Sequence, residues 1–293
     1  MLAVIAGIDD LPELSFHTGD GELEELRADI VEFIETTIDG AGAAGVIVAM
    51  SGGIDSTLTA YLACEALGSD RVTAMLLPCH LTDAVNTLDA RSLAENLGVE
   101  TVCVQIQPLL DMFEDTVAPA VDDGVDRVAI GNAVARLRMA ATYYAANRTN
   151  KLVCGTSNRT ELLLGYFTKH GDGAADLRPL AGLYKTEVRA LAGHVGVPSS
   201  IIEKTPTADL WAGQTDESEL GAPYGLIDVI LHALVDSDLG VSGTATELGI
   251  DEAIVGQYAN RLVENRHKRL PTPTPDGTRD VREELFFELE SRF

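Results

Sequence analysis

Six consecutive residues, Ser51-Gly52-Gly53-Ile54-Asp55-Ser56, have types and spacing that could bind a phosphate. Glycines let the backbone approach an anion closely and adopt positive φ angles. The N–H groups at the start of a following helix would point at that anion. The serine hydroxyls add donors, whereas Asp55 would repel a bare phosphate. We therefore expect a phosphate-binding loop in which a cation, most simply Mg²⁺, lies between Asp55 and the phosphates.

This loop differs from the common nucleotide-binding motifs. A Walker A sequence, G-x-x-x-x-G-K-[ST], occurs nowhere in the chain. Gly40–Gly45 matches G-x-G-x-x-G, but it follows a helical pattern and precedes a strand pattern, the wrong order for a dinucleotide fingerprint. We interpret it as a helix-to-strand connection. Taken alone, Ser51–Ser56 could also be an ordinary strand-to-helix turn.

A second polar stretch, Gly155–Asp176, has the composition of a binding site. Its first part follows an apolar segment, and Glu161 comes about one helical turn after Asn158. The part from Gly165 onward holds three glycines, a lysine, a histidine and two aspartates within twelve residues. This stretch is too polar for a core, and a surface loop is the alternative interpretation.

The elements that must position these loops follow from apolar periodicity. Apolar residues with helical spacing predict helices at 22–38, 56–67, 82–97, 132–147 and 185–195. Short apolar runs, several of which end at glycine or proline, predict strands at 45–50, 71–77, 99–106 and 152–154. The stretch at 107–125 is mixed. Alternating strands and helices indicate a doubly wound, Rossmann-like parallel sheet with helices on both faces. Ligands bind at the carboxyl ends of such strands, where Ser51 and Thr156 both fall. We expect one α/β domain over 1–293, with an N-terminal helical segment at 1–44, a nucleotide-binding core at 45–270 and a tail at 271–293.

The charge balance is strongly acidic. The chain has 46 Asp and Glu against 21 Lys and Arg, for a net charge of −25, which disfavours nucleic acid as a partner. Its only lysines are Lys151, Lys169, Lys185, Lys204 and Lys268. This pattern resembles proteins from salt-loaded cytoplasm, where salt screens self-repulsion. We expect the fold to be lost in low salt.

Nothing in the sequence predicts a membrane or an oxidising environment. No apolar run approaches the roughly 18 residues of a membrane-spanning helix, and the N-terminus lacks the features of a signal peptide. The four cysteines, Cys64, Cys79, Cys103 and Cys154, lie in apolar segments without a C-x-x-C pair. We expect buried thiols in a cytoplasmic protein.

Four motifs together resemble a known family. The S-G-G-x-D-S loop is similar to that of the ATP pyrophosphatases, which split ATP between its α and β phosphates. Gly131–Met139 (G-N-x-x-A-R-x-R-M), Gly155–Leu180 (GTSNRTELLLGYFTKHGDGAADLRPL) and Arg266–Arg269 (RHKR) resemble the signatures of NAD synthetase, in the same order. About 45 residues precede the loop, too few for the amidase domain of glutamine-dependent members. The resemblance is therefore to the ammonia-dependent form.

The resemblance implies an amidation reaction. The carboxylate of deamido-NAD⁺ attacks the α-phosphorus of the co-substrate ATP and forms an acyl-adenylate, and ammonia then displaces AMP to give NAD⁺. It also implies bound Mg²⁺ and a homodimer whose partner chain helps to complete the dinucleotide site. The apolar stripe at 23–38 and the Ala-rich helix at 132–147 are candidate dimer contacts, with packing inside the domain as the alternative.

The resemblance assigns roles residue by residue. Asp55 and Glu161 would bind Mg²⁺, and Asp55, Lys185 and Asp172 would be catalytic, Asp172 in the ammonia step. The residues implied for ATP are Ala49, Met50, Ser51, Gly52, Gly53, Ile54, Asp55, Ser56, Thr156, Lys185 and Thr207. Those implied for deamido-NAD⁺ are Asn132, Arg136, Lys169, Asp176, His267 and Lys268. Three of the five lysines fall in these motifs, which favours functional roles for them.

Two other functions and several positions stay open. A GMP-synthetase-type ATP pyrophosphatase would need a different substrate-binding half, and a nucleotide sensor of the universal-stress type would not need two carboxylates on separate loops. Residues 78–83 depart from the bacterial pattern of the family, and 277–293 match nothing. Tyr224 and Trp211 are interpreted as packing residues, whereas Tyr143 could belong to the core or to the site.

Overall fold

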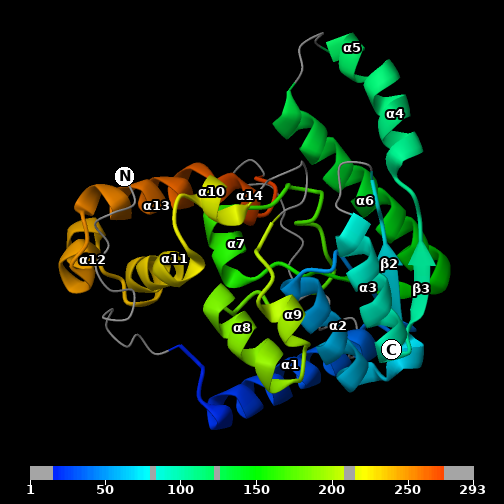
Figure 1. Cartoon of the computed structure of the whole chain (residues 1–293), viewed down its shortest axis with the longest axis horizontal. Helices are drawn as coiled ribbons and strands as arrows, with labels where there is room; N and C mark the ends of the chain where they lie inside the picture. The colour runs from blue at the N-terminus through cyan, green and yellow to red at the C-terminus, as the bar shows by residue number, and fades with distance from the viewer. Residues whose placement is uncertain (1–15, 80–83, 122–125, 208–214, 274–293) are drawn as a thin grey trace, which may run out of the picture.

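A computed structural model describes residues 16–79, 84–121, 126–207 and 215–273. Within them, four parallel strands form one sheet in the order β3-β2-β1-β4 (Figure 1). The strands are β1 (Gly45–Ala49), β2 (Val72–Leu76), β3 (Glu100–Cys103) and β4 (Lys151–Cys154). The central strand β1 reads as a continuous apolar run, and β2 does so apart from Thr73, because both of their faces are covered.

Helices pack on both faces of this sheet. Val46 and Val48 of β1 point to the face covered by α1 (Asp20–Gly40), α2 (Ile54–Leu67), α3 (Ala84–Leu97) and α8 (Lys185–His194). Ile47 points to the other face, against α6 (Arg127–Thr149), and α4 (Gln107–Thr116) packs beside α6. Successive strand residues point to opposite faces, so one apolar strand serves two cores. The predicted doubly wound α/β fold is confirmed.

The chain after β4 builds a helical cluster beside the sheet (Figure 1). Its buried centre includes Leu226, Ile230 and Tyr258. The cluster comprises α7 (Arg159–Leu164), α10 (Asp216–Leu220), α11 (Tyr224–Leu231), η3 (His232–Asp236), α12 (Val241–Leu248), α13 (Glu252–Glu264) and α14 (Arg266–Arg269). Helix α8 contacts both α2 and α11, so it joins the cluster to the sheet. The remaining short elements are η2 (Ser69–Arg71), α5 (Ala118–Val121) and α9 (Ser199–Ile202).

Most predicted elements occur near their expected bounds. The strand expected at 99–106 is shorter and ends at Cys103, and the mixed stretch at 107–125 contains α4 and α5. Helix α6 begins at Arg127, five residues before the predicted start at 132, because Asp126 caps it by accepting from the N–H groups of Val128 and Ala129. The glycines of 40–45 connect α1 to β1 as expected. Residues 80–83, Trp211 and the tail beyond 273 lie outside the described residues.

Two sequence expectations change at the level of packing. The α1 stripe of Leu23, Ile30, Ile34 and Ile38 is buried in the sheet core, so packing inside the domain explains it rather than a dimer contact. Cys103 was expected to be buried but is exposed, because β3 is the edge strand of the sheet. Across the described ranges, no helix is long and apolar enough to span a membrane.

Candidate active site

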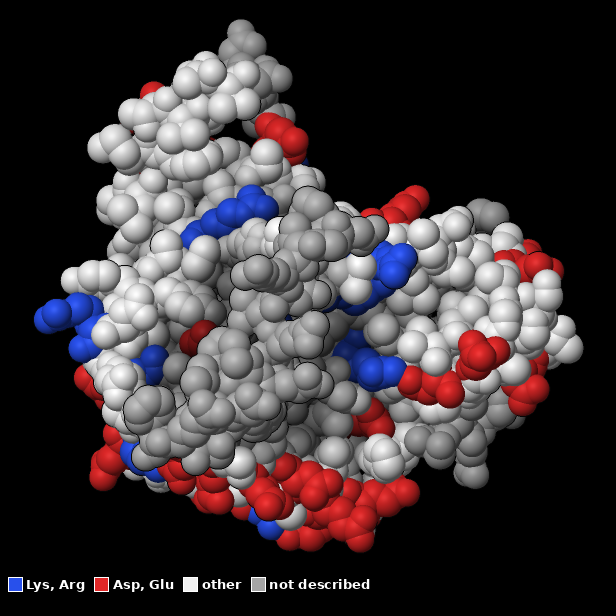
Figure 2. Space-filling model, turned by 180° about the vertical axis from the view of Figure 1, so that it is seen from behind, with Lys and Arg blue, Asp and Glu red and all other residues white. Residues whose placement is uncertain are grey.

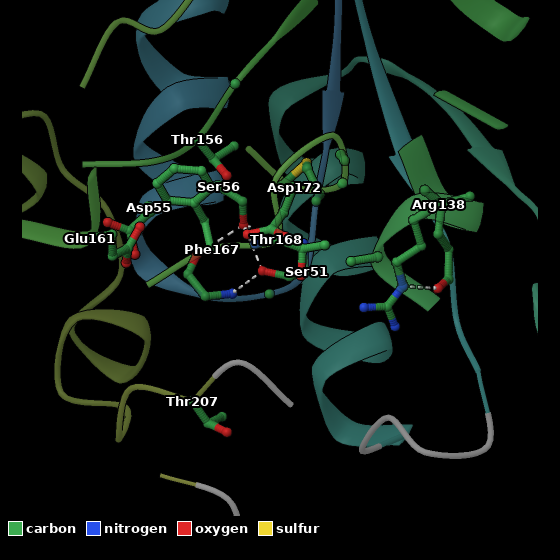
Figure 3. A pocket seen from close by; sticks show the side chains of 18 of the residues that line it. Ser51, Asp55, Ser56, Arg138, Thr156, Glu161, Phe167, Thr168, Asp172 and Thr207 are labelled. Carbon is green, nitrogen blue, oxygen red and sulfur yellow. Dashed lines mark hydrogen bonds between the residues drawn. The ribbon is translucent and has the colours of Figure 1, made fainter. Parts of the chain in front are cut away.

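The phosphate loop joins β1 to α2. Gly52 has a φ of +80°, and a Cβ there would lie 2.3 Å from the carbonyl oxygen of Asn86, so only glycine fits. Two serines brace the loop internally: the Ser51 N–H donates to Ser56 Oγ at 3.2 Å, and Ser56 Oγ donates to the Gly53 carbonyl at 3.1 Å (Figure 3). Gly53 is the N-cap of α2, whose first N–H groups are therefore available to an anion.

A second loop, between β4 and α7, meets the first. Asn158 caps α7 by accepting from the Glu161 N–H at 3.0 Å, while the Glu161 carboxylate accepts from the Asn158 N–H. The Asn158 side chain also donates from Nδ2 to Asp55 Oδ1 at 2.8 Å. Asn158 thereby fixes both predicted metal-binding carboxylates relative to each other.

A buried lysine lies between these carboxylates. Lys185, the first residue of α8, is 2% exposed, and its Nζ donates to Asp55 Oδ2 and, at 3.4 Å, to Glu161 Oε1. Burial and the neighbouring Asp55 raise the pKa of Glu161 to about 8. Burial alone would lower the pKa of Lys185, but the two carboxylates outweigh it and raise that pKa. The ammonium therefore stays charged and balances part of the negative charge.

A pocket of about 610 Å³ opens over these groups. It extends from the carboxyl ends of β1 and β2 across to β4 and is also lined by α6 and the 165–172 loop. Figure 3 shows Asp55 beside Glu161 on one side of the view and Arg138 on the other. Most of the predicted site residues line it: Ala49 to Ser56, Asn132, Thr156, Glu161, Asp172, Lys185, Thr207 and Lys268. Removal from bulk solvent raises the pKa of Asp172, which accepts from the Thr168 N–H at 2.9 Å.

Four of the six residues predicted for the dinucleotide lie outside the pocket lining. Arg136 Nη2 donates to the Lys169 carbonyl at 3.2 Å, and Lys169 Nζ donates to the His267 carbonyl at 2.8 Å. Asp176 accepts from the Val153 N–H at 2.8 Å and from the Tyr143 hydroxyl at 3.3 Å. Arg136, Lys169 and His267 therefore form one contiguous group, the basic rim, which is made by α6, the 165–176 loop and α14.

The other two dinucleotide residues line the pocket through the same loop. Asn132 Oδ1 accepts from the Thr168 hydroxyl at 2.6 Å. Lys268 Nζ donates to the carbonyls of Gly165 and Phe167 at 2.6 and 3.0 Å. Both side chains therefore hold the 165–172 loop in place as well as facing the pocket.

Sequence reasoning assigned no catalytic or binding role to several polar residues in or beside the pocket, among them Asp216, Lys204 and Tyr224. Asp216 is buried, accepts from the hydroxyls of Tyr224 at 2.8 Å and Tyr166 at 3.2 Å, and has a pKa raised by burial. Tyr224 is buried as expected, but its ring also faces the Lys185 ammonium, 5.1 Å from the centroid. Lys204 lines the pocket too. Only the scarcity of lysine could have drawn attention to Lys204, whereas the partners of Asp216 are distant in sequence.

The donor set suits Mg²⁺. No group of three or more metal-binding side chains occurs among the residues that the structure describes. Mg²⁺ commonly uses one or two carboxylates and completes its shell with substrate phosphates and water. Asp55 and Glu161, joined through Asn158 beside a phosphate loop, supply that set.

Comparison with known proteins gives one consistent result. A family model described as NAD synthase matches residues 26–272. An NH₃-dependent NAD⁺ synthetase of Methanosarcina mazei is 43% identical over 87% of this chain and 99% of its own length. The protein of that name from Halobacterium salinarum is 41% identical over 91% of this chain and 98% of its own length.

Two solved structures have the same fold. The NMN synthetase of Francisella tularensis has a TM-score of 0.74 and 36% identity, over 87% of this chain and 98% of that one. The NH₃-dependent NAD synthetase of Campylobacter jejuni, in complex with nitrate, has a TM-score of 0.72 and 31% identity, over 87% and 99%.

Proposed function

The chain belongs to the NAD synthase family, and from this we propose that it catalyses the ATP-dependent amidation of deamido-NAD⁺ by ammonia, giving NAD⁺, AMP and pyrophosphate. One observation carries the proposal. The carboxylates of Asp55 and Glu161 meet the buried ammonium of Lys185 beside a phosphate loop. Relatives that are 41–44% identical over 84–91% of this chain are named NH₃-dependent NAD⁺ synthetases.

The proposed reaction has two steps. A nicotinate carboxylate oxygen bonds to the α-phosphorus of ATP, the bond from that phosphorus to the bridging oxygen breaks, and pyrophosphate leaves. The nitrogen lone pair of ammonia then bonds to the acyl carbon, AMP leaves with the electron pair of the C–O bond, and the nitrogen loses a proton. The loop N–H groups and Lys185 would hold the phosphates where charge develops on the leaving group.

Mg²⁺ belongs to this proposal. Asp55 and Glu161 would hold the ion, which would neutralise negative charge on the ATP phosphates. Asp172 lines the pocket and has a raised pKa. A carboxyl with a raised pKa is a stronger base when ionised, so we propose Asp172 as the group that accepts the proton released in the ammonia step.

We also propose a homodimer. Arg136, Lys169 and His267 of the basic rim lie outside the pocket lining of their own chain, so a partner chain beside them would enclose the distal half of a dinucleotide. Apolar side chains on α4 to α6 are exposed and could form the contact: Leu109, Met112, Val117, Val121, Val128 and Tyr144. The cytoplasmic location, the single-domain boundaries and salt adaptation remain predictions from the sequence.

A second substrate has a specific observation in its favour. The Francisella tularensis structure, with a TM-score of 0.74, is that of an NMN synthetase. Nicotinate mononucleotide carries the same carboxylate without the distal adenylate, so it needs the pocket but not the basic rim. We favour deamido-NAD⁺ because the more similar relatives are named NAD⁺ synthetases.

One assay tests both substrates. Purified protein in high salt receives ATP, Mg²⁺ and ammonium with deamido-NAD⁺, nicotinate mononucleotide or XMP, and the amidated product and AMP are quantified. We expect NAD⁺ at the highest kcat/KM, and much less product when glutamine replaces ammonium. Preferential formation of NMN would reassign the substrate, and turnover of XMP would assign a GMP-synthetase-type activity.

A further inference from the structure

Lys204 contacts three segments that are far apart in the sequence. It lies just after α9 and is 25% exposed. Its Nζ donates to the Gly52 carbonyl of the phosphate loop at 3.2 Å and to Asp89 Oδ2 on α3 at 2.7 Å. One ammonium therefore connects the phosphate loop, α3 and the segment that continues to Thr207.

The contact with Gly52 fixes the orientation of a peptide group in the loop. Because a trans peptide directs its C=O and N–H in opposite directions, holding the Gly52 carbonyl outward turns the Gly53 N–H towards Ser51, whose Oγ accepts it at 3.3 Å. The loop is also seated on α3, since a Cβ at Gly52 would lie 2.3 Å from Asn86 O and 3.4 Å from Ala90 N. Asp89 lies on this same turn of α3 and holds Lys204 in place.

The segment after Lys204 leads to another wall of the pocket. Thr205, Pro206 and Thr207 line the pocket. The Pro206 carbonyl accepts from the Asp216 N–H at 3.0 Å, and Asp216 begins α10. A displacement at Lys204 would therefore reach both the phosphate loop and the α10 wall.

We propose that Lys204 is a positioning residue for ATP, oriented by Asp89, which holds the phosphate loop and residues 204–207 in a fixed relation. This inference rests on the proposed function only in taking ATP as the substrate. Partly exposed ion pairs contribute little to global stability. The consequence of losing Lys204 should therefore appear in nucleotide binding rather than in the melting temperature.

Direct binding and kinetics of the full chain test the proposal. Binding of α,β-methylene-ATP with Mg²⁺ is measured by calorimetry in high salt for wild type, Lys204→Met and Lys204→Arg. We expect the methionine variant to raise Kd about tenfold, with a similar fall in kcat/KM for ATP. The KM for deamido-NAD⁺ should change less than about twofold, and Lys204→Arg should restore most of the affinity because it keeps a charged donor.

Lys151→Met is the matched control. Its ammonium donates to the Thr73 hydroxyl at 2.6 Å and lies 4.0 Å from Glu100, at the amino end of the sheet and outside the pocket lining. Its nucleotide affinity should equal that of wild type. Adding Asp89→Asn to Lys204→Met should raise Kd by less than the product of the two single effects, because both substitutions remove the same contact.

Hydrogen exchange separates positioning from a merely structural role. In wild type the ATP analogue should protect both 51–56 and 203–207, whereas in Lys204→Met the protection at 203–207 should be lost. An unchanged Kd for Lys204→Met, or an equal loss for both substrates together with a lower melting temperature, would overturn the inference. So would a wild-type protein that does not bind the analogue, whereas a protein that binds it but makes no NAD⁺ would refute only the proposed function.

Discussion

The ammonium of Lys185 is buried between two carboxylates. A lysine ammonium that is nearly completely buried is costly unless anions surround it, and here Asp55 and Glu161 do so. Burial and the negative charge of Asp55 keep the pKa of Glu161 high, because ionising Glu161 would place a second buried carboxylate beside Asp55 with one ammonium to balance both. A divalent cation that arrives with ATP would relieve the repulsion. In the proposed reaction, substrate and metal would complete the charge balance around Lys185.

The raised pKa of Glu161 predicts a specific dependence of stability on pH. The folded-state pKa is about 8 against an ordinary value of 4.5, so the folded protein binds this proton more tightly than the unfolded chain. Its contribution to stability is fully present below the unfolded value and is lost as pH rises through the folded value. Without Mg²⁺, wild type should lose stability relative to Glu161→Gln between about pH 4.5 and about pH 8. Chemical unfolding in high salt measures this, and a constant difference over that interval would contradict it.

At the scale of elements, α14 and the 165–176 loop form one structural unit. Lys268 donates to two loop carbonyls, and the His267 carbonyl accepts from Lys169. The RHKR motif thus braces the loop that carries Asp172. This explains why two motifs about a hundred residues apart belong to one site.

Substitution of Gly165 should weaken the packing of the 165–176 loop against α14 and the residue before it. Gly165 has a φ of +65°, and a Cβ would lie 2.3 Å from Asn265 Cβ, so Gly165→Ala faces both a strained backbone and a collision. We expect a loss of stability of more than about 1 kcal/mol and a higher KM for deamido-NAD⁺, measured by chemical unfolding and steady-state kinetics.

Gly182→Ala provides the control for Gly165→Ala. Gly182 has no atom within 4 Å of its would-be Cβ. It should behave like wild type, and equal effects of the two substitutions would exclude the proposed role of α14.

For the molecule as a whole, charge is unevenly distributed. Figure 2 shows Asp and Glu crowded along the lower edge of one face, whereas Lys and Arg lie scattered over its middle and left side. With 46 acidic against 21 basic side chains, the basic residues cannot neutralise the acidic ones. Self-repulsion of this size opposes the compact state. Screening by salt reduces it because the Debye length falls to about 3 Å at 1 M.

The acidic surface predicts a salt requirement. The melting temperature should rise steeply from dilute buffer to molar KCl. The enzyme should be inactive in dilute buffer and active in high salt. Differential scanning calorimetry across KCl concentrations measures this. Choline chloride at equal ionic strength should substitute if screening is the cause, and a melting temperature independent of salt would refute the adaptation.

The projecting arm predicts the dimer contact. Helices α4 and α5 and the start of α6 extend beyond the rest of the molecule (Figure 1). Met112 and Val121 there are 64% and 82% exposed. We expect Met112→Glu to shift a dimer to monomers in light scattering and to raise the KM for deamido-NAD⁺ more than that for ATP. Val263→Glu, at a 72% exposed position on α13, is the control. A wild-type protein that is monomeric and fully active would contradict the proposed dimer.

The sequence by itself determined the elements and the chemistry of the loops. Strand runs such as Gly45–Ala49, the glycines after them and the cap at Asn158 act over a few residues, so their consequences can be read locally. The same patterns placed Ser51 and Thr156 at one edge of a parallel sheet. They did not indicate the early start of α6, which depends on a single cap at Asp126.

Only the tertiary structure decided which charges meet and which surfaces are covered. Lys185 meets Asp55 across 130 residues of sequence, and Lys204 meets Gly52 across 152. Packing also buried the α1 stripe and left Leu109 and Met112 of α4 exposed, although Leu110 of the same helix is buried. The tertiary structure also left Arg136 outside the pocket lining. Such outcomes depend on packing between distant segments. Hydrophobic burial is non-directional, so a local apolar pattern specifies which face of an element is buried but not which element covers it.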